Sequence, residues 1–300
     1  MIKYYEYKTF RKRKPFYPVL KVLNMKVVIT AAGMGTRLLP MTKELPKEMM
    51  PVFSKINGKK CVMPLLQLIF EQMYECKVRK YCFVVGREKR SIEDHFTPDT
   101  SFLKNSSQKN KRMIENFYKK INSSNLLWVN QHSPKGFGDA VKQCQQFIGN
   151  DNFIVHAGDV AIIGSKIHPV MRLIDAGKDP NVSAVLLFRK VKDPKRHGVP
   201  TLEKISNSKF LVKKVIEKPN KPTSNLGLMP VYYFKAKIFE KLKRIKPGKG
   251  NEYQLTDAIE CLIKDGEKVL AIPLLGTEKV LDVGTVESYK EAQVNSFKFV

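Results

Sequence analysis

Residues 31–51 have the composition of a phosphate-binding loop. They read AAGMGTRLLPMTKELPKEMMP and follow a short apolar segment. Gly33 and Gly35 can adopt positive φ angles and let backbone N–H groups approach an anion closely. Arg37 and Lys47 supply the positive charge that a polyphosphate requires. An apolar strand followed by a glycine-rich and then cationic loop therefore predicts binding of a phosphorylated ligand.

Two common phosphate-binding motifs do not fit this loop. The sequence lacks G-x-x-x-x-G-K-[ST], which argues against a P-loop ATPase. Leu38 stands at the third glycine of G-x-G-x-x-G, which argues against a dinucleotide-binding fold. An ordinary turn with surface lysines is the alternative, but the pattern of glycines, cations and prolines continues through the whole loop and favours a functional site.

Polar residues also follow two other apolar segments. Residues 130–141 read NQHSPKGFGDAV; their glycines let backbone amides or a flat base come close, and the amide of Gln131 can read a pyrimidine edge. Asp159 ends the segment FIVHAGD, at the position where open α/β sheets bind ligands. An ionised aspartate there requires a partner, and a divalent cation is a suitable one. The alternative for residues 130–141 is that their glycines only shape a turn.

Acidic residues late in the chain complete the candidate set. Asp282 follows a short apolar run and precedes Gly284, so alone it fits a metal ligand or a helix N-cap, and its pairing with Asp159 favours the metal. Glu217 and Lys218 end another apolar segment. Because neighbouring residues of a strand point to opposite sides, we expect these two side chains not to pair with each other. A solvated acid–base pair before a turn is the alternative.

Together, these segments resemble the sugar-1-phosphate nucleotidylyltransferase family, and most closely its UTP–glucose-1-phosphate uridylyltransferases (UDP-glucose pyrophosphorylases). Residues 33–51 fit G-x-G-T-R-x-x-P-x-T-K-x-x-P-K-E-M-x-P, residues 89–96 fit K-R-x-I-E-D-H-F, and residues 252–257 fit E-x-Q-L-T-D. The resemblance runs from Met25 nearly to the C-terminus. It implies an α/β fold with a Rossmann-like mixed, mainly parallel sheet flanked by helices, of the nucleotide-diphospho-sugar transferase type.

The resemblance also implies roles for individual residues. Nucleotide binding is expected of Ala31, Ala32, Gly33, Gly35, Thr36, Gln131 and Gly136. A catalytic role is expected of Arg37, Lys47 and Lys218. Sugar binding is expected of Gly158, Gly198, Glu217 and Asn225. The Mg²⁺ ligands are expected to be Asp159 and Asp282.

The implied reaction is transfer of a uridylyl group from UTP to glucose-1-phosphate, giving UDP-glucose and pyrophosphate by Mg²⁺-assisted in-line attack of the sugar phosphate on the α-phosphorus. Alternatives are a relative that uses dTTP with glucose-1-phosphate or UTP with N-acetylglucosamine-1-phosphate, and a catalytically silent regulatory relative. Asp139 stands where bacterial members commonly have histidine, and Pro230 where relatives usually have glycine. Both departures concern selectivity for base and sugar rather than the type of reaction.

Alternating apolar segments and helical patterns from Met25 onward are typical of a mainly parallel α/β sheet. We expect strands at 26–30, 80–85, 126–130, 153–157 and 182–188. We expect helices from Pro64, over 90–96 with Ser91 as the cap, and over 113–121, 236–242 and 254–264. Residues 98–125 are expected to form an excursion from the sheet. Residues 25–300 are expected to form one domain, with a nucleotide-binding part of about 25–190 and a sugar-binding part of about 191–300.

Residues 1–24 contain seven lysines or arginines and one glutamate, so we expect a basic extension that is disordered or lies upstream of the true start. A basic arm for an anionic partner is the alternative. The net charge of +26 would attract nucleic acid or anionic metabolites. The lysines are spread over the whole chain, however, which disfavours a nucleic-acid role.

Five scattered cysteines without a C-x-x-C pair argue against a zinc site or a disulfide framework and for a reducing environment. No apolar run approaches the roughly 18 residues that cross a bilayer, and no secretory signal pattern is present. We therefore expect a cytoplasmic protein without a membrane partner. The resemblance adds UTP and glucose-1-phosphate as substrates and a homo-oligomer as the expected assembly.

Overall fold

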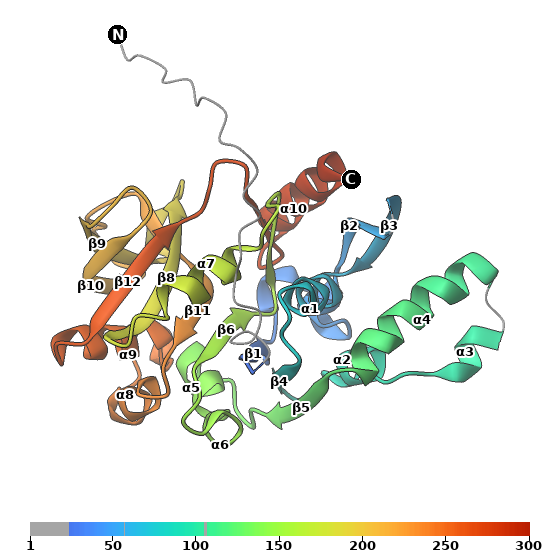
Figure 1. Cartoon of the computed structure of the whole chain (residues 1–300), viewed down its shortest axis with the longest axis horizontal. Helices are drawn as coiled ribbons and strands as arrows, with labels where there is room; N and C mark the ends of the chain where they lie inside the picture. The colour runs from blue at the N-terminus through green and yellow to red at the C-terminus, as the bar shows by residue number, and fades with distance from the viewer. Residues whose placement is uncertain (1–23, 57, 105–106) are drawn as a thin grey trace, which may run out of the picture.

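One large mixed sheet organises the molecule (Figure 1). The computed structural model describes residues 24–56, 58–104 and 107–300, so the expected extension 1–24 lies outside the described residues except for Asn24. The strands of the sheet are β1 (Lys26–Ala31), β4 (Lys80–Val85), β5 (Asn125–Asn130), β6 (Phe153–Ala157), β8 (Val182–Lys190), β9 (Gly198–Lys204), β10 (Phe210–Glu217), β11 (Leu226–Phe234) and β12 (Lys268–Pro273). They lie in the order β5-β4-β1-β6-β11-β8-β12-β10-β9.

Most of these strands run in the same direction. β1 pairs in parallel with β4 and β6, β4 with β5, and β8 with β12. β11 is antiparallel to β6 and β8, and β10 is antiparallel to β9 and β12. The expected mixed, mainly parallel sheet is confirmed, and each of the five expected strands is present within two residues of its expected bounds.

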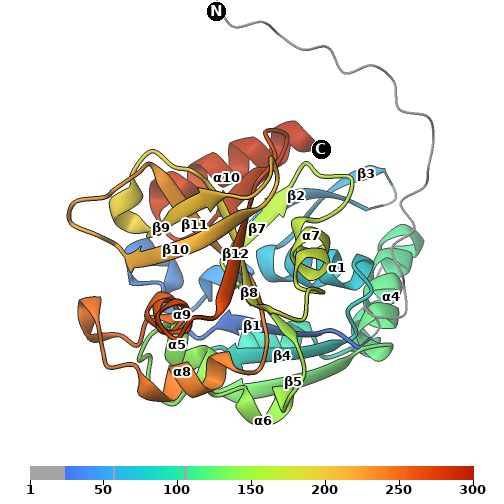
Figure 2. The same cartoon turned by 60° about the vertical axis from the view of Figure 1, so that its left-hand side comes forward.

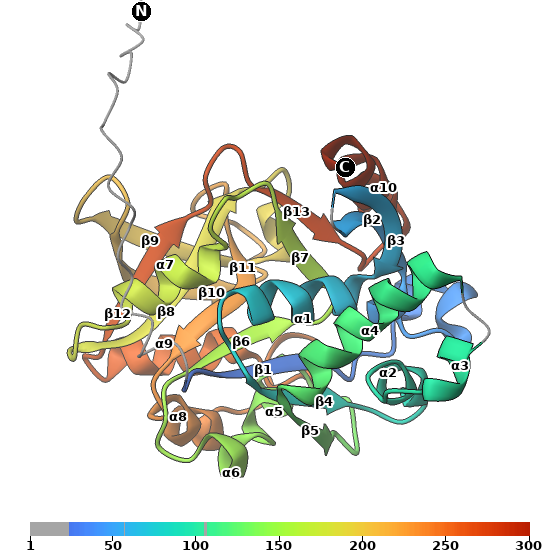
Figure 3. The same cartoon turned by 45° about the vertical axis from the view of Figure 1, so that its right-hand side comes forward.

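Helices cover both faces of the sheet, as Figures 2 and 3 show from two directions. One face carries α1 (Leu65–Glu75), α2 (Arg90–His95), α4 (Gln108–Asn122) and α7 (Pro169–Ala176). The other face carries α5 (Phe137–Lys142), α6 (Gln145–Ile148), α8 (Ile238–Arg244) and α9 (Leu255–Lys264). β1 contributes to both hydrophobic cores because its side chains alternate, with Val27 and Ile29 in the first core and Val28 in the second.

The expected helices are present, with small shifts at their starts. Pro64 is the N-cap of α1 rather than its first residue, and the segment 113–121 lies within α4. The excursion 98–125 contains α4 and the short helix α3 (Thr100–Lys104). The predicted cap at Ser91 is wrong, because α2 begins at Arg90 and Lys89 takes the N-cap position without a side-chain hydrogen bond.

Two small sheets in the described residues lie outside the large one. The hairpin of β2 (Pro51–Ile56) and β3 (Lys59–Pro64) lies beside α10 (Val286–Phe299) in Figure 1. The rings of Phe53 and Phe297 pack edge-on between them, with their centroids 5.1 Å apart. β7 (Val160–Ile163) pairs antiparallel with β13 (Lys279–Asp282), so Asp282 lies opposite Val160. This second pairing brings a late part of the chain to the end of β6. Among the described residues, no helix is both long and apolar enough to cross a membrane.

His95 lies in an aromatic cluster between α1, α2 and α4. Its ring packs against Phe96 and Phe117 at centroid distances of 5.5 and 5.2 Å, and its Nε2 lies 3.0 Å from Gln67 Oε1. Burial lowers the pKa of His95 to about 4, and the nearby carboxylate of Glu71 opposes this effect only in part. The folded protein therefore keeps this histidine neutral at pH values where an unfolded chain would protonate it.

Replacing His95 with glutamine should remove part of the acid sensitivity of folding. The folded-state pKa is below the unfolded value of about 6.5, so the stability that neutral His95 contributes is complete above pH 6.5 and is lost as the pH falls. Between pH 7 and pH 5 the wild-type free energy of unfolding should fall by about 2 kcal/mol more than that of His95→Gln. Urea denaturation at both pH values measures the free energies of unfolding. If the free energy of unfolding changed equally between pH 7 and pH 5 in the two proteins, the buried neutral state of His95 would be contradicted.

Candidate active site

The carboxyl ends of β1 and β6 lie next to each other and carry the first candidate residues. Gly158 N–H, after β6, donates to Thr30 O of β1 at 2.8 Å. Lys47 Nζ lies 2.5 Å from Asp159 Oδ2. A Cβ on Gly33 would lie only 3.3 Å from Lys47 Nζ, so the glycine leaves the space in which this ammonium sits. The lysine of the predicted phosphate loop and the predicted strand-end aspartate therefore meet at one site.

Burial and charge act in opposite directions on this pair. Burial alone would lower the pKa of Lys47, but attraction to Asp159 and Glu48 more than offsets burial, so the pKa is raised above its ordinary value. Burial alone would raise the pKa of Asp159, but Lys47 and, to a smaller extent, Arg37 hold it below its ordinary value. Both groups are therefore charged at neutral pH.

A second buried ion pair involves the next residue of the chain. Glu48 is 1% exposed, and its Oε2 accepts a hydrogen bond from Lys89 Nζ at 3.1 Å. Burial raises the pKa of Glu48, and Lys89 and Lys47 oppose this rise. Since Lys47 and Glu48 are neighbours in the turn Lys47–Met49, the two ion pairs fix this turn from both sides.

The glycine-rich loop presents a second cation. Gly35 has a φ of 68°, and Thr42 Oγ1 donates to Gly35 O at 2.7 Å, which closes the loop. Arg37 follows in the next turn and is exposed. Its charge lowers the pKa of both Lys47 and Asp159, so it lies close enough to act on the buried pair. The loop thus combines a partly buried ammonium with an exposed guanidinium.

The loop after β5 is fixed against Tyr253. Gly136 has a φ of 110°, and a Cβ there would come within 2.8 Å of Tyr253 O. Gly138 N–H donates to the same carbonyl at 2.8 Å, and Tyr253 N–H donates to Lys135 O at 2.7 Å. Gln131, at the start of the loop, is 5% exposed. Both glycines are required for this close packing, and the E-x-Q-L-T-D segment forms the other wall.

Asp159 and Asp282 approach each other through their strands. Because β13 pairs with β7, Val283 N–H donates to Asp159 O at 3.1 Å. Asp282 Oδ1 accepts from Gly284 N–H at 2.6 Å, and its Oδ2 accepts no hydrogen bond from the described residues. The described part of the chain holds no group of three or more His, Cys, Asp and Glu that could bind a metal. Two carboxylates nevertheless fit Mg²⁺, which is usually bound by one or two carboxylates together with water and substrate phosphates.

Glu217 and Lys218 pair with each other, contrary to expectation. Lys218 Nζ lies 3.4 Å from Glu217 Oε1. The prediction is wrong because β10 ends at Glu217, and Lys218 has a φ of 40°, which takes it out of strand geometry. Thr256 Oγ1 donates to Glu217 Oε2 at 2.6 Å, and a Cβ on Gly198 would lie 3.2 Å from the same oxygen. The structure thus brings the predicted Gly198 beside the predicted pair of Glu217 and Lys218.

The remaining residues singled out from the sequence differ in their exposure and in their position in the fold. Ala31 is buried at the end of β1, Ala32 is 9% exposed, and Thr36 is exposed in the loop. Asn225 is exposed before β11, and no hydrogen bond within the described part of the chain joins its side chain to Glu217. Pro230 lies at a bulge where the register between β11 and β8 shifts, a position where a missing N–H is tolerated.

Three residues near the site were not singled out from the sequence. Lys89 pairs with Glu48, and Thr256 donates to Glu217. Burial lowers the pKa of Arg189, and the neighbouring Asp282 opposes this effect, so a guanidinium lies near the second predicted metal ligand. Lys89 and Thr256 do lie inside recognised motifs, which was the available signal, but the motifs do not reveal their partners.

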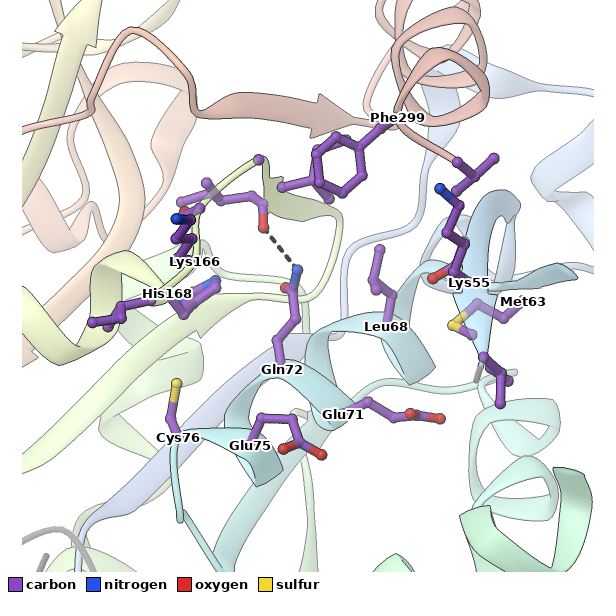
Figure 4. A pocket seen from close by; sticks show the side chains of 18 of the residues that line it. Lys55, Met63, Leu68, Glu71, Gln72, Glu75, Cys76, Lys166, His168 and Phe299 are labelled. Atoms are coloured by element: carbon purple, nitrogen blue, oxygen red, sulfur yellow. Dashed lines mark hydrogen bonds between the residues drawn. The ribbon is translucent and has the colours of Figure 1, made fainter. Parts of the chain in front are cut away.

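A separate cavity lies away from these residues (Figure 4). It is lined by residues of α1, the β2–β3 hairpin, the segment after β7 and the C-terminal end. Gln72, in its floor, donates to Ile162 O at 2.7 Å. Its lining includes no residue to which the sequence assigns a role, so the candidate chemistry belongs to the carboxyl ends of β1 and β6.

A cationic loop, an aspartate at the carboxyl end of β6 and a second aspartate brought beside it by the pairing of β13 with β7 define an enzyme that handles phosphorylated substrates. The chain belongs to the nucleotidyl transferase family, whose sequence model matches residues 26–298. It is 34% identical over 264 residues to the UTP–glucose-1-phosphate uridylyltransferase of Bacillus subtilis strain 168, covering 86% of each chain. It is 35% identical over 266 residues to UTP–glucose-1-phosphate uridylyltransferase 2 of Streptococcus pyogenes serotype M3, covering 86% of this chain and 85% of the relative.

Solved structures show the same similarity. A crystal structure of UDP-glucose pyrophosphorylase complexed with UDP-glucose superposes with a TM-score of 0.79 and 30% identity, covering 91% of this chain and 98% of the other. UTP-bound UGPase from Acinetobacter baumannii superposes with a TM-score of 0.76 and 25% identity, covering 90% of this chain and 92% of the other. The fold class and family implied by the sequence motifs are therefore confirmed.

Replacing Lys89 with methionine should strongly destabilise the protein, because it leaves Glu48 buried without its partner. Loss of one member of a buried ion pair typically costs about 3–5 kcal/mol. The double variant Lys89→Met/Glu48→Gln should recover most of that loss, since no buried charge remains. Guanidinium denaturation at pH 7 measures the free energies of unfolding. A single variant within about 0.5 kcal/mol of wild type would show that the pair does not support the fold.

Proposed function

We propose that this protein transfers a uridylyl group from UTP to glucose-1-phosphate, releasing pyrophosphate and forming UDP-glucose. The observation that carries this proposal is the contact of Lys47 with Asp159, which places a charged phosphate-loop cation beside an ionised strand-end carboxylate. The names of the similar proteins support UTP and glucose-1-phosphate as the substrates. Relatives with these names cover most of the chain, so the whole catalytic unit is available for comparison.

The sugar phosphate serves as its own nucleophile in this reaction. A phosphate monoester has a second pKa near 6, so its oxygen is already charged at neutral pH and needs no general base. The protein must instead bring two polyanions together and orient them in line, which is a task of positioning and charge neutralisation. Arg37 and Lys47 would contact the triphosphate, while Lys218, held 3.4 Å from Glu217, would contact the sugar phosphate.

The proposed substrate-binding residues form two groups, one for the nucleotide and one for the sugar. Gln131 and Gly136 would bind the base, together with Ala31, Ala32, Gly33, Gly35 and Thr36 of the first loop. Gly198 and Glu217 would bind the sugar hydroxyls, together with Gly158 and Asn225. Asp159 and Asp282 would hold Mg²⁺, which when bound neutralises phosphate charge and polarises the α-phosphoryl group. The chain's own contribution is to keep Asp159 ionised beside Lys47 and to hold both carboxylates in place.

Pyrophosphate release by the purified protein tests this proposal. UTP, dTTP, CTP and ATP are each offered with glucose-1-phosphate and with N-acetylglucosamine-1-phosphate, in the presence of Mg²⁺ or of EDTA. We expect the highest kcat/KM for UTP with glucose-1-phosphate and loss of turnover in EDTA. Preference for dTTP or for the N-acetylated sugar would assign a different member of the family. No turnover with any pair would support the catalytically silent alternative.

Replacing Arg37 or Lys218 with alanine should lower kcat by roughly 10²–10³-fold, the effect of removing one preorganised charge donor at a reacting phosphate. The exposed Lys204, on β9, provides a matched control, because Lys204→Ala removes a cation outside the site. Steady-state kinetics with UTP and glucose-1-phosphate measure kcat for the two site variants and for the control. Near-normal turnover in a folded Arg37→Ala or Lys218→Ala protein would show that the role of that residue is misassigned.

Three features stay predictions. The division into a nucleotide-binding part of about 25–190 and a sugar-binding part of about 191–300 follows the order of the motifs. Self-association is implied by the resemblance, and sedimentation equilibrium of the full chain measures it. A cytoplasmic location agrees with the substrates, and fractionation of cells measures it.

A further inference from the structure

The side-chain amide of Gln131 is held by two acceptors. Its Nε2 donates to Asp139 Oδ2 at 2.7 Å and to Gly136 O at 3.2 Å. A carboxylate and a backbone carbonyl are both acceptors only, so the two Nε2 hydrogens are used by the protein itself. The carbonyl oxygen Oε1 accepts no hydrogen bond from the described residues. Gln131 thus offers an acceptor, and no donor, to a ligand.

Asp139 makes the shorter of the two contacts that set this orientation. If the amide were rotated by 180°, Oε1 would face the carboxylate of Asp139 and the carbonyl of Gly136, and both contacts would be repulsive. A neutral side chain at position 139 that could donate as well as accept would remove the shorter repulsive contact and leave only the longer one with Gly136 O. The second oxygen of Asp139 lies 3.4 Å from Gln143 Nε2, so Oδ2 remains directed to Gln131.

The surrounding backbone is too tightly packed to adjust to another base. Gln131 N–H donates to Val85 O at 2.8 Å, and Gly138 N–H donates to Tyr253 O at 2.8 Å. A Cβ on Gly136 or Gly138 would come within 2.8 Å of Tyr253 O. The amide orientation, rather than movement of the loop, is therefore the variable that can change which hydrogen-bonding edge is accepted.

We propose that Asp139 is a positioning residue that makes the base site select uracil against cytosine. This inference rests on the proposed use of UTP. Uracil has an N3–H donor, which matches the free Oε1 of Gln131. A cytosine bound in the same position would set its unprotonated N3 acceptor against Oε1, because the cytosine donor is the N4 amino group at the place of the uracil O4. A site that leaves two acceptors in contact rejects the wrong base strongly, because the buried groups remain unpaired. Asp139 acts only through Gln131, and the selectivity is carried by the fixed amide.

The test compares the nucleotide selectivity of wild type and Asp139→Asn. Asparagine has nearly the same shape but can accept from Gln131 Nε2 or, when rotated, donate to Oε1, so the rotated Gln131 amide is opposed only by the longer contact with Gly136 O. We expect the ratio of kcat/KM for UTP over CTP, with glucose-1-phosphate, to fall at least tenfold. The ratio for UTP over 5-methyl-UTP should stay within twofold of wild type, because both bases carry the same N3–H.

Asp175→Asn is the matched control, since it makes the same change in an exposed ion pair between Asp175 of α7 and Lys178, which follows the helix. Its UTP-over-CTP ratio should equal that of wild type. Equilibrium binding of UTP and CTP to each protein provides a second readout that does not depend on turnover. A folded Asp139→Asn protein with an unchanged ratio of UTP to CTP affinity would overturn the inference.

Failure of the proposed function gives a different result. If wild type releases no pyrophosphate from UTP but binds UTP over CTP, and Asp139→Asn loses this preference, the inference stands and the reaction is misassigned. If wild type binds both nucleotides equally, the inference itself is wrong. Circular dichroism and the denaturation midpoint of each variant confirm that the compared proteins are folded.

Discussion

The candidate site depends on two neighbouring ion pairs that lie near the carboxyl end of β1 and are shielded from solvent to different degrees. Lys89 pairs with Glu48 and Lys47 pairs with Asp159, so two consecutive residues of one turn are tied to two different elements. Removing Lys89 would leave the buried Glu48 without its partner, which is strongly unfavourable. Removing Lys47 would leave the partly buried Asp159 uncompensated. The turn is therefore set before a ligand arrives. The ammonium of Lys47 occupies the space beside Gly33, where the proposed function requires a phosphate-binding cation.

The phosphate loop and the aspartate after β6 could be predicted because each is marked by residues that are continuous in the sequence. Gly33 and Lys47 were recognised because their loop is continuous in sequence, and Asp159 because it ends an apolar run. Buried parallel strands are near-continuous apolar segments, so β1, β4 and β6 also stand out without knowledge of their neighbours. The fold class and the first half of the site follow from patterns of this kind. In these segments the local preference and the tertiary structure agree.

Contacts between segments that are distant in sequence could not be predicted, because no continuous sequence pattern marks them. Lys89 lies 41 residues from its partner Glu48, and Thr256 lies 39 residues from Glu217. The expectation for Glu217 and Lys218 failed because it continued strand geometry through a residue with a φ of 40°. A positive φ in a residue other than glycine is uncommon, and nothing in the residue type announces it. Tertiary packing decided these contacts, and only the assembled chain contains that information.

The second candidate metal ligand depends on another buried ion pair. Glu278, whose side chain is fully buried, accepts hydrogen bonds from Arg172 Nη2 of α7 at 2.7 and 2.6 Å. A buried arginine–carboxylate contact is directional, so it fixes the loop that enters β13 and hence the position of Asp282. Asp159 is positioned separately, by Lys47. The Asp159 carboxylate is thus held by direct contact with a lysine, whereas Asp282 is placed indirectly, through the strand whose start is anchored by the pair of Arg172 and Glu278.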